Sequence, residues 1–267
     1  MINDFTEYIY KNYSFTKRDS LIWRIYNTPY NVFISEIMLQ QTQVERVKYH
    51  FEKWINIFPD FNSLAHASTE NVLHYWQGLG YNRRALFLLE SAKIISNTYN
   101  GIVPQDKNIL KQLPGIGDYT AGALLIFGYN QSETIIETNI RTVYLKYFFE
   151  NESNVSDKKI LPLIEQTIDH KNPRQWYYLL MDAGNYIKKN EKNYNHSSKH
   201  YQKQSQFIGS KRQIRAKIIK KLLTEKHILI KDLELLYQRN DLLDIIKSLE
   251  KDNMIIIDNN YIQIKSL

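Results

Sequence analysis

Apolar residues recur every three or four positions along most of residues 1–205, and turn-forming residues separate the apolar runs. This spacing is typical of helices that bury one face in a core and expose the other to solvent. Four of the predicted helices cover residues 69–77, 82–98, 107–112 and 119–128. We therefore expect a mainly helical structure in this part of the chain.

The pattern changes near residue 188. Residues 188–210 are polar and basic with almost no apolar positions, which predicts a linker or a surface loop. Beyond them, three helical periods precede "MIIIDNNYIQIK", whose apolar residues alternate around Asn259-Asn260 as in a β-hairpin. Three short helices and a two-stranded ribbon describe a winged helix, a module that binds DNA or protein.

The segment "FISEIMLQQTQVERV", residues 33–47, contains one carboxylate, Glu36, in an otherwise apolar helical run. A few residues later, Thr42-Gln43-Val44-Glu45 fits a capping box, in which the threonine and glutamate side chains satisfy free backbone N–H groups at a helix start. We expect one helix to end near Gln40 and the next to begin at Thr42. Gln41 would then lie in the corner between them.

Composition limits the class of protein. The 267 residues are 43% hydrophobic and 24% charged, as in a globular protein with a sizeable core. The uninterrupted apolar runs are far shorter than the roughly 18 residues that a membrane-spanning helix needs. The first residues, Met1-Ile2-Asn3-Asp4, show no signal-peptide pattern. We expect an intracellular protein with no membrane partner, cytoplasmic and nucleoid-associated in a bacterium.

The net charge and the cysteine content limit the partners and the kinds of site that the chain can have. Lys and Arg number 35 against 28 Asp and Glu, so the formal net charge is +7, which favours a polyanionic partner such as nucleic acid. The chain has no cysteine. This excludes disulfides, thiolate nucleophiles and metal sites that depend on cysteine ligands.

The stretch "LPGIGDYTAG", residues 113–122, predicts a tight turn between two helices. Gly115 and Gly117 free the backbone to turn, and Asp118 can cap the next helix. Backbone N–H groups at such a helix start suit a phosphate. An ordinary corner between two helices is the alternative interpretation.

Four motifs occur in one order: "SEIMLQQTQV", "WQGLGYNRRA", "LPGIGDYTAG" and "IIETNIRTVY". In this order and at these spacings they resemble the adenine DNA glycosylases of MutY type, within the helix-hairpin-helix base-excision DNA glycosylases. The match runs from about Trp23 to Ile187. The resemblance implies an all-α glycosylase core of two helical subdomains, to which this chain adds a small α+β winged-helix domain.

The resemblance also implies a division of the chain. A six-helix barrel subdomain with the helix-hairpin-helix is expected over 21–128, and a second helical subdomain carrying the catalytic loop over 1–20 and 129–187. A basic linker would follow over 188–210 and the winged-helix-like domain over 211–267.

Breaking a glycosidic bond to a purine calls for an acid that protonates the leaving base and a negative group that stabilises the sugar cation. Glu36 is the candidate acid, because helical spacing surrounds it with Val32, Phe33 and Leu39 and apolar surroundings favour a neutral carboxyl group. By resemblance it would protonate N7 of adenine. A glutamate in a salt bridge on a helix surface is the alternative.

The second carboxylate departs from the family. Where these enzymes carry an Asp-Gly-Asn loop, this chain has Glu137-Thr138-Asn139. Glutamate is one methylene longer, and Thr138 does not readily adopt a positive φ. We expect Glu137 to be the electrostatic stabiliser that also positions water, with Asn139 orienting it.

Tyr119 occupies the position where bifunctional members of the superfamily carry a catalytic lysine. Without that amine no Schiff base forms, so the resemblance implies a monofunctional, hydrolytic enzyme.

The remaining site residues concern DNA. A base must leave the helical stack before it can be cleaved, and protein side chains must fill the gap. Two corners of the chain are suited to enter the duplex: Gln41 and Thr42 form one, and Leu79 and Tyr81 form the other. Alternatively, Leu79 and Tyr81 are turn and core residues. The further candidates are Trp23 and Arg24 for the adenine pocket, and Gly115, Gly117, Lys188 and Lys189 for DNA phosphates.

The family usually binds a [4Fe–4S] cluster through four cysteines, and the corresponding positions here hold no cluster ligand: Lys188, Asn195, Ser198 and Gln204. We therefore expect a clusterless variant without a metal cofactor, while a monovalent cation at the hairpin is compatible with the resemblance. His196 and His200 are one helical turn apart, and we interpret them as surface residues. The basic run of this segment would replace the cluster loop as a phosphate-binding surface.

The function expected from the resemblance is excision of adenine mispaired with 8-oxoguanine or guanine in double-stranded DNA, by a monomer. Two alternatives stay open. One is a thymine or uracil mismatch glycosylase, which the altered "ETN" loop permits but Glu36 disfavours, because a pyrimidine has no N7. The other is a non-catalytic DNA-binding scaffold.

Overall fold

A computed structural model describes residues 2–203 and 206–266. Its contacts separate the chain into two compact units. Unit 1 holds the chain up to Glu36, then Pro104–Gln112, and then the stretch from Ile116 to the gap at 204–205. Unit 2 holds Ile37–Val103, Leu113–Gly115 and the described residues after the gap.

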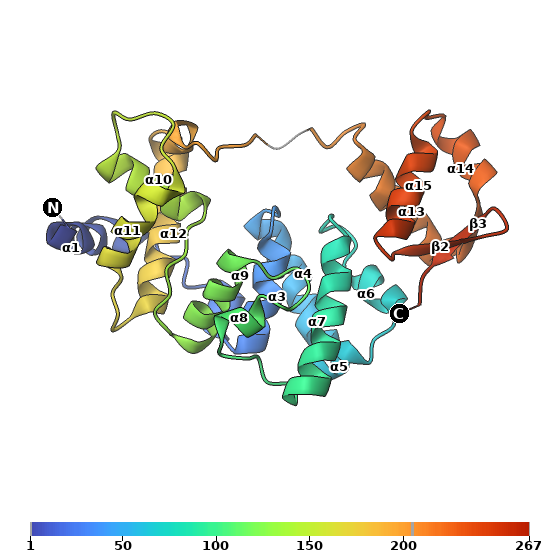
Figure 1. The fold of residues 1–267 in the computed structure, drawn as a ribbon, viewed down its shortest axis with the longest axis horizontal. Helices are drawn as coiled ribbons and strands as arrows, with labels where there is room; N and C mark the ends of the chain where they lie inside the picture. The colour runs from blue at the N-terminus through green and yellow to red at the C-terminus, as the bar shows by residue number, and fades with distance from the viewer. Residues whose placement is uncertain (1, 204–205, 267) are drawn as a thin grey trace. The chain divides into compact units, whose positions relative to one another are not determined.

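Unit 1 is helical. Its elements are α1 (Ile2–Tyr13), η1 (Ser14–Thr16), α2 (Ile22–Ile25), most of α3 (Pro29–Leu39), α8 (Lys107–Leu110), α9 (Asp118–Ala123), the π-helical turn η2 (Leu124–Gly128), α10 (Thr138–Phe148), α11 (Asp157–Thr167), α12 (Pro173–Asn190) and η3 (Tyr194–Ser197). Helices α10 and α12 pack side by side (Figure 1). Gly184 of α12 makes this possible, because a Cβ atom there would collide with the backbone of Asn139 in α10.

Unit 2 combines helices with a small sheet. Its elements are the end of α3, α4 (Val44–Ile57), α5 (Phe61–Ala65), α6 (Thr69–Tyr75), α7 (Arg83–Tyr99), α13 (Lys211–Glu225), β1 (His227–Leu229), α14 (Ile230–Tyr237), α15 (Leu242–Lys251), β2 (Ile255–Asp258) and β3 (Tyr261–Ile264). The antiparallel sheet has the order β1-β3-β2. Asn259 and Asn260 join β2 to β3 with φ of 47° and 66°, as a type I′ hairpin turn requires. The expected winged helix is confirmed, with one more strand than the pattern predicted.

Aromatic side chains form the centre of each unit. In unit 2, the rings of Trp54 and Trp76 are fully buried and meet edge to face with centroids 5.6 Å apart. In unit 1, Phe5 packs against Tyr144 and Trp176 with centroids 5.2 Å and 6.2 Å away. Large aromatic rings bury much apolar area, so these clusters are a main source of stability for the helices that carry the site.

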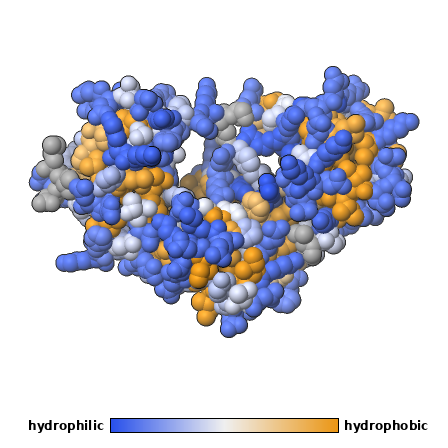
Figure 2. Space-filling view, in the orientation of Figure 1, coloured by the Kyte–Doolittle hydropathy of each residue, from blue (hydrophilic) through white to orange (hydrophobic). Residues whose placement is uncertain are grey.

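The surface is mainly hydrophilic. Figure 2 shows hydrophilic residues over most of the visible face, with hydrophobic patches that include part of the winged helix. Within the described residues, every helix is too short or too polar to cross a membrane.

Two predicted helix caps are wrong. Helix α4 has Gln43 at its N-cap and no capping side chain, because the Thr42 hydroxyl is used by Arg84 Nη2, 3.0 Å away. Helix α9 has Gly117 at its N-cap, so Asp118 begins the helix and forms an ion pair with Lys111 at 2.6 Å. In both cases a long basic side chain binds the group that the local pattern assigned to the backbone.

The expected linker over 188–210 is only partly a linker. Helix α12 continues to Asn190, and the following turn η3 packs on α10 with Tyr194 and Asn195 buried. Asn195 Nδ2 donates to Thr142 Oγ1 at 2.5 Å, and Ser198 forms a parallel bridge with Val155. Polar residues therefore anchor this segment through hydrogen bonds, which a search for apolar periodicity does not detect. The other expected domain boundaries stay predictions.

Candidate active site

Glu36 lies near the end of the apolar helix α3, and 9% of the residue is exposed. Its helical neighbours Val32 and Phe33 are buried, as the sequence pattern predicted. Tyr119, in the first turn of α9, donates a hydrogen bond from its hydroxyl to the Glu36 carboxyl group. The helix-hairpin-helix corner thus presents a phenol to the buried acid.

The corner itself depends on Gly115. This residue has φ of +77°, and a Cβ atom there would lie 2.7 Å from Cδ2 of Phe87. Both observations require glycine at this position. Gly117 has an ordinary negative φ of −98°, and a Cβ atom there would meet open space. The prediction that Gly117 supplies unusual backbone freedom is therefore wrong, although the space beside it stays accessible to a ligand.

Glu137 is the N-cap of α10. Its Oε1 accepts from the backbone N–H groups of Asn139 at 2.8 Å and Ile140 at 2.9 Å, and its Oε2 accepts from Asn139 Nδ2 at 3.3 Å. A negative group at a helix N-terminus is stabilised by the free N–H groups and the helix dipole. Thr138 begins the helix, so the altered loop needs no positive φ at this residue. Asn139 contacts Glu137 in the way the sequence predicted.

Glu36 and Glu137 interact electrostatically. Burial raises the pKa of Glu36 to about 7, and the nearby Glu137 also raises it, whereas Tyr119 and Arg24 lower it. Burial raises the pKa of Glu137 as well, while the N–H groups of Asn139 and Ile140 lower it. The N–H groups at the start of α10 therefore favour the ionised form of Glu137, whereas burial favours the protonated form of Glu36. Two carboxyl groups in unequal environments can divide the roles of acid and anion.

A buried ion-pair cluster lies beside the two glutamates. Arg24 binds Asp182 with both terminal nitrogens at 2.7 Å and 3.0 Å, and its guanidinium is 4.1 Å from the ring centroid of Tyr178. Arg18 Nε lies 2.6 Å from the same carboxylate. Arg24 lowers the pKa of Glu36, and Arg18 lowers the pKa of Glu137. Asp182 therefore holds two cations near the reacting groups.

Sequence reasoning missed Asp182, Arg18 and Tyr178. The signal for Asp182 was present, because it is an acidic residue between apolar neighbours in the helix segment "LLMDAGNYI". Arg24 was expected in the base pocket, but the structure commits its guanidinium to Asp182, so its effect on a ligand would act through charge and packing. Trp23 is buried, with 5% exposed.

The two expected DNA corners both lie in unit 2, and Arg84 joins them. Its Nη1 donates to the carbonyl groups of Ile37, Met38 and Gln40 at 2.7, 3.0 and 2.6 Å. Its Nη2 contacts the Thr42 hydroxyl and the carbonyls of Leu79 and Gly80 at 3.0, 3.2 and 3.0 Å. This buried arginine, absent from the sequence-based site, holds the end of α3 against the turn before α7.

The side chains at these corners differ in exposure. Gln41 is exposed and Thr42 and Tyr81 are partly exposed, but Leu79 is buried with 3% exposed. The expectation of an accessible Leu79 is therefore wrong, and the alternative of a core residue describes it correctly. An apolar side chain at a turn is more stable inside than in water.

Lys188 and Lys189 lie exposed in the last turn of α12. The residues that correspond to cluster ligands do not fit an iron–sulfur cluster, because Lys188, Asn195 and Ser198 offer no thiolate; Gln204 lies outside the described residues. Asn195 is instead used in a hydrogen bond to Thr142. In the described part of the chain, no three His, Cys, Asp or Glu side chains form a metal-binding group.

Comparison with known proteins identifies the class. Residues 34–168 match the family model of the HhH-GPD superfamily base excision DNA repair proteins, and the chain belongs to this superfamily. The matched region contains Glu36, Tyr119 and Glu137, and the sequence-based recognition of the superfamily is confirmed.

The curated relatives give a narrower similarity. The chain is 40% identical over 156 residues to "Adenine DNA glycosylase" of Buchnera aphidicola subsp. Baizongia pistaciae, covering 58% of this chain and 44% of the relative. It is 33% identical over 159 residues to the Homo sapiens protein of the same name, covering 58% of this chain and 29% of the relative. The chain spans about half the length, or less, of the curated relatives it matches.

Solved structures share the fold. A thermostable thymine-DNA glycosylase superposes with a TM-score of 0.61 at 25% identity, covering 72% of this chain and 88% of that one. Endonuclease III in a non-covalent DNA complex gives a TM-score of 0.54 at 15% identity, over 70% and 81% of the two chains. The second likeness concerns the fold alone.

Proposed function

We propose that this chain is a monofunctional DNA glycosylase that hydrolyses the N-glycosidic bond of adenine mispaired with 8-oxoguanine or guanine. The observation that carries the proposal is the pair of glutamates in unequal environments. Glu36 is buried and has a pKa raised to about 7, and Glu137 is capped by backbone N–H groups. Relatives named adenine DNA glycosylase support the choice of base.

In the proposed reaction, Glu36 donates its proton to N7 of the extruded adenine. The bond between the sugar carbon and N9 breaks, and its electron pair leaves with the neutral base. The sugar then carries a positive charge, which the Glu137 carboxylate stabilises. Water adds to the sugar carbon, and its proton passes to a carboxylate, which leaves an abasic site.

Glu137 is one methylene longer than the aspartate of the family. The N-cap geometry compensates, because two backbone N–H groups and Asn139 Nδ2 hold the carboxylate against the start of α10. We propose that this fixed position lets Glu137 fill the role of the shorter residue.

Tyr119 provides a phenol and no amine at the corner of the hairpin. A Schiff base with the abasic sugar needs an amine nucleophile, so the enzyme should release the base without efficient strand cleavage. We predict that borohydride traps no covalent adduct between the purified protein and an abasic duplex. An adduct visible on a denaturing gel would show that another amine reaches the sugar.

DNA binding is proposed for separate groups of residues. Gly115 and Gly117 at the hairpin and Lys188 and Lys189 at the end of α12 would contact phosphates, and the hairpin could hold a monovalent cation there. Gln41, Thr42 and Tyr81 would contact the opened duplex. The substrate is double-stranded DNA with a mismatch, and the enzyme acts as a monomer in the compartment that holds the DNA.

A thymine or uracil mismatch glycosylase is the second candidate, supported by the likeness to the thymine-DNA glycosylase structure. The buried, protonated Glu36 favours a purine, because the thymine or uracil ring offers no N7 to protonate. A non-catalytic scaffold is the third candidate.

One experiment separates the candidates. The protein is incubated with duplexes containing A·8-oxoG, A·G, T·G or U·G and then treated with alkali, which cuts abasic strands. Cleavage of the adenine strand supports the proposal, cleavage of a pyrimidine strand supports the second candidate, and no cleavage supports the scaffold. Glu36→Gln should abolish base release, and an active variant would contradict the role of Glu36.

A further inference from the structure

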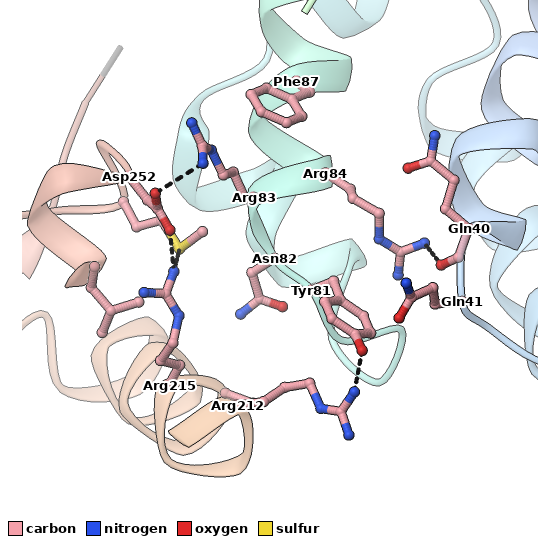
Figure 3. Close-up of a pocket in the computed structure, with 13 residues that line it drawn as sticks. Gln40, Gln41, Tyr81, Asn82, Arg83, Arg84, Phe87, Arg212, Arg215 and Asp252 are labelled. Carbon is pink, nitrogen blue, oxygen red and sulfur yellow. Dashed lines mark hydrogen bonds and ion pairs between the residues drawn. The ribbon is translucent and has the colours of Figure 1, made fainter. Parts of the chain in front are cut away.

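Two cavities of the molecule differ in chemical character. The larger, of about 500 Å³, lies in unit 2 beside Gln41 and Tyr81 of the DNA corners (Figure 3). Four arginine side chains line it: Arg83, Arg84, Arg212 and Arg215. Arg212 also donates to the Tyr81 hydroxyl. An arginine-rich wall suits phosphate, so this cavity belongs to the proposed DNA surface.

The smaller cavity, of about 200 Å³, lies in unit 1 and has aromatic walls. Helix α1 supplies Asp4, Phe5 and Tyr8, and the end of α10 supplies Tyr147 and Phe148. Asp4 and Tyr8 are one helical turn apart and therefore lie on the same face of α1. Of the described residues that line this cavity, Asp4 is the only charged one. A carboxylate and negative ring faces both repel an anion, so the cavity disfavours phosphate.

The rings of this cavity are tilted against one another. The ring centroids of Phe5 and Tyr147 are 5.7 Å apart with the planes at 65°, and those of Tyr8 and Tyr147 are 5.1 Å apart at 61°. Phe148 meets Phe5 at 5.0 Å and 55°. Stacked rings would cover each other's faces, whereas tilted rings can turn faces toward the space between them. The four rings therefore form walls that face in different directions.

Hydrogen bonds and packing hold these rings in place. The Tyr147 hydroxyl is hydrogen-bonded to that of Tyr13 at 2.8 Å and also to that of Tyr8. Phe5 is 5% exposed and belongs to the aromatic centre of unit 1, whereas Tyr8 is 44% exposed and lies at the open side. A cavity with fixed walls loses little conformational entropy when a ligand binds.

One of the walls already binds a cation of the chain itself. Lys146 Nζ lies 5.3 Å from the ring centroid of Tyr147, within the range of a cation–π contact. The same ammonium group forms an ion pair with Glu191 at 2.5 Å, which compensates its charge. Lys146 therefore repels a second cation only weakly.

We propose that this cavity binds a small organic cation that carries a quaternary ammonium group. Such a group has no N–H donor and spreads its positive charge over its methyl groups, which can contact several ring faces at once. Asp4 supplies the opposite charge at the cavity. A primary ammonium group or a metal ion holds its water more tightly and would need acceptors that aromatic walls do not offer.

The site is separate from the proposed reaction. Glu137 caps the start of α10, whereas Tyr147 and Phe148 are the last two residues of the same helix. The separation along the helix is about 15 Å. Binding of the cation can therefore be measured without DNA, and the result does not depend on which base the protein excises.

The test compares choline with its uncharged analogue, in which a carbon atom replaces the nitrogen. The two molecules have nearly the same shape, so they differ mainly in charge. The full-length chain is titrated with each at constant ionic strength, and saturation-transfer NMR of the methyl signals gives the dissociation constants. Choline should bind with a dissociation constant on the order of 1 mM, and the uncharged analogue should bind at least about tenfold more weakly.

Variants of the cavity locate the binding. Tyr8→Leu should weaken choline binding by about tenfold, because leucine keeps the apolar volume but has no ring face, whereas Tyr8→Phe should keep most of the affinity. Tyr26→Leu is the control, because Tyr26 is 61% exposed and does not line the cavity. It should bind choline like the wild type.

The charge is tested on its own. Asp4→Asn should weaken choline binding by about threefold at low salt. Glu7→Gln is the matched control, because it removes an exposed carboxylate of the same helix that does not line the cavity. Circular dichroism and thermal unfolding check that each variant is folded.

Three results would overturn the inference. In the first, the wild type shows no detectable binding of choline. In the second, the uncharged analogue binds as well as choline, which identifies an apolar groove and no cation site. In the third, Tyr8→Leu binds choline like the wild type, or Glu7→Gln weakens binding as much as Asp4→Asn, which places the cation elsewhere on the surface.

Discussion

At the scale of single residues, Glu36 shows how one environment changes a common side chain. An exposed glutamate is ionised at neutral pH, whereas burial in α3 raises the pKa of this one to about 7, so a large share of it is still protonated there. A carboxylic acid with this pKa can give up a proton to a leaving base and recover it from water. The same burial lowers the free energy of unfolding at any pH where Glu36 would be ionised in the unfolded chain.

The first prediction concerns stability. Below a pH of 4.5, Glu36 is protonated in the folded and the unfolded chain; between 4.5 and about 7 only the folded chain keeps the proton, so stability falls across this window. Glu36→Gln removes this effect. At about pH 8 the variant should exceed the wild type in free energy of unfolding by up to about 3 kcal/mol.

Urea unfolding at several pH values measures this difference. The two proteins should converge near about pH 4. A wild type that is as stable as the variant at high pH would mean that Glu36 is not penalised by burial.

The second prediction concerns rate. Because the protonated form of Glu36 is the donor, single-turnover base release from A·8-oxoG should slow as the pH rises through about 7. At lower pH the rate should fall again once Glu137 is protonated, since its pKa is also raised. A rate that increases steadily above neutral pH would contradict the assignment of the acid.

At the scale of elements, Arg84 connects the end of α3 to the turn before α7 in unit 2. One guanidinium satisfies carbonyl groups at the end of α3 and in the turn before α7, where hydrogen bonds inside the helices cannot do so. The neighbouring Arg83 makes an ion pair with Asp252 and is 58% exposed in its side chain. The two adjacent arginines therefore provide a matched comparison.

Arg84→Ala should lower the free energy of unfolding by roughly 2–4 kcal/mol, because it leaves several buried carbonyl groups without a donor. Arg83→Ala should cost less than about 1 kcal/mol, as expected for an exposed ion pair. Chemical denaturation of both variants gives the comparison. Equal costs would mean that water replaces Arg84 at the corner.

At the scale of the whole molecule, the excess of positive charge would attract the negatively charged phosphates of a DNA substrate. Part of it is carried by the lysines of residues 188–203, a segment that Asn195 and Ser198 hold in place. The exposed lysines of this segment could bind DNA phosphates and release the counterions around them.

Replacing Lys188, Lys189 and Lys199 by glutamine should flatten the dependence of log Kd on log salt concentration by up to about 2.7, about 0.9 for each lost phosphate contact. Replacement of Lys11, Lys158 and Lys171, three exposed lysines elsewhere in unit 1, is the control. Fluorescence anisotropy over a salt series gives both slopes. If the first triple variant kept the wild-type slope, this segment would not contact phosphates.

Local rules explain what the sequence predicted well. Apolar periodicity placed α6, α7 and the winged helix within a few residues, because each helix buries one face wherever it packs. The same rules failed at Thr42, Asp118 and Leu79, where Arg84, Lys111 and the core determine the conformation. They also missed Asp182, whose two arginine partners lie more than a hundred residues away.

The sequence by itself determined the chemical groups and their order: two glutamates, a tyrosine in place of an amine, a glycine corner and no cysteine. These follow from covalent identity and short-range spacing. Only the tertiary structure decided that Glu36 is buried beside Tyr119 and Glu137, and that Arg212 meets Tyr81 over a cavity. A pKa and a binding site depend on which atoms exclude water and which charges lie near, and folding brings those atoms together from distant parts of the chain.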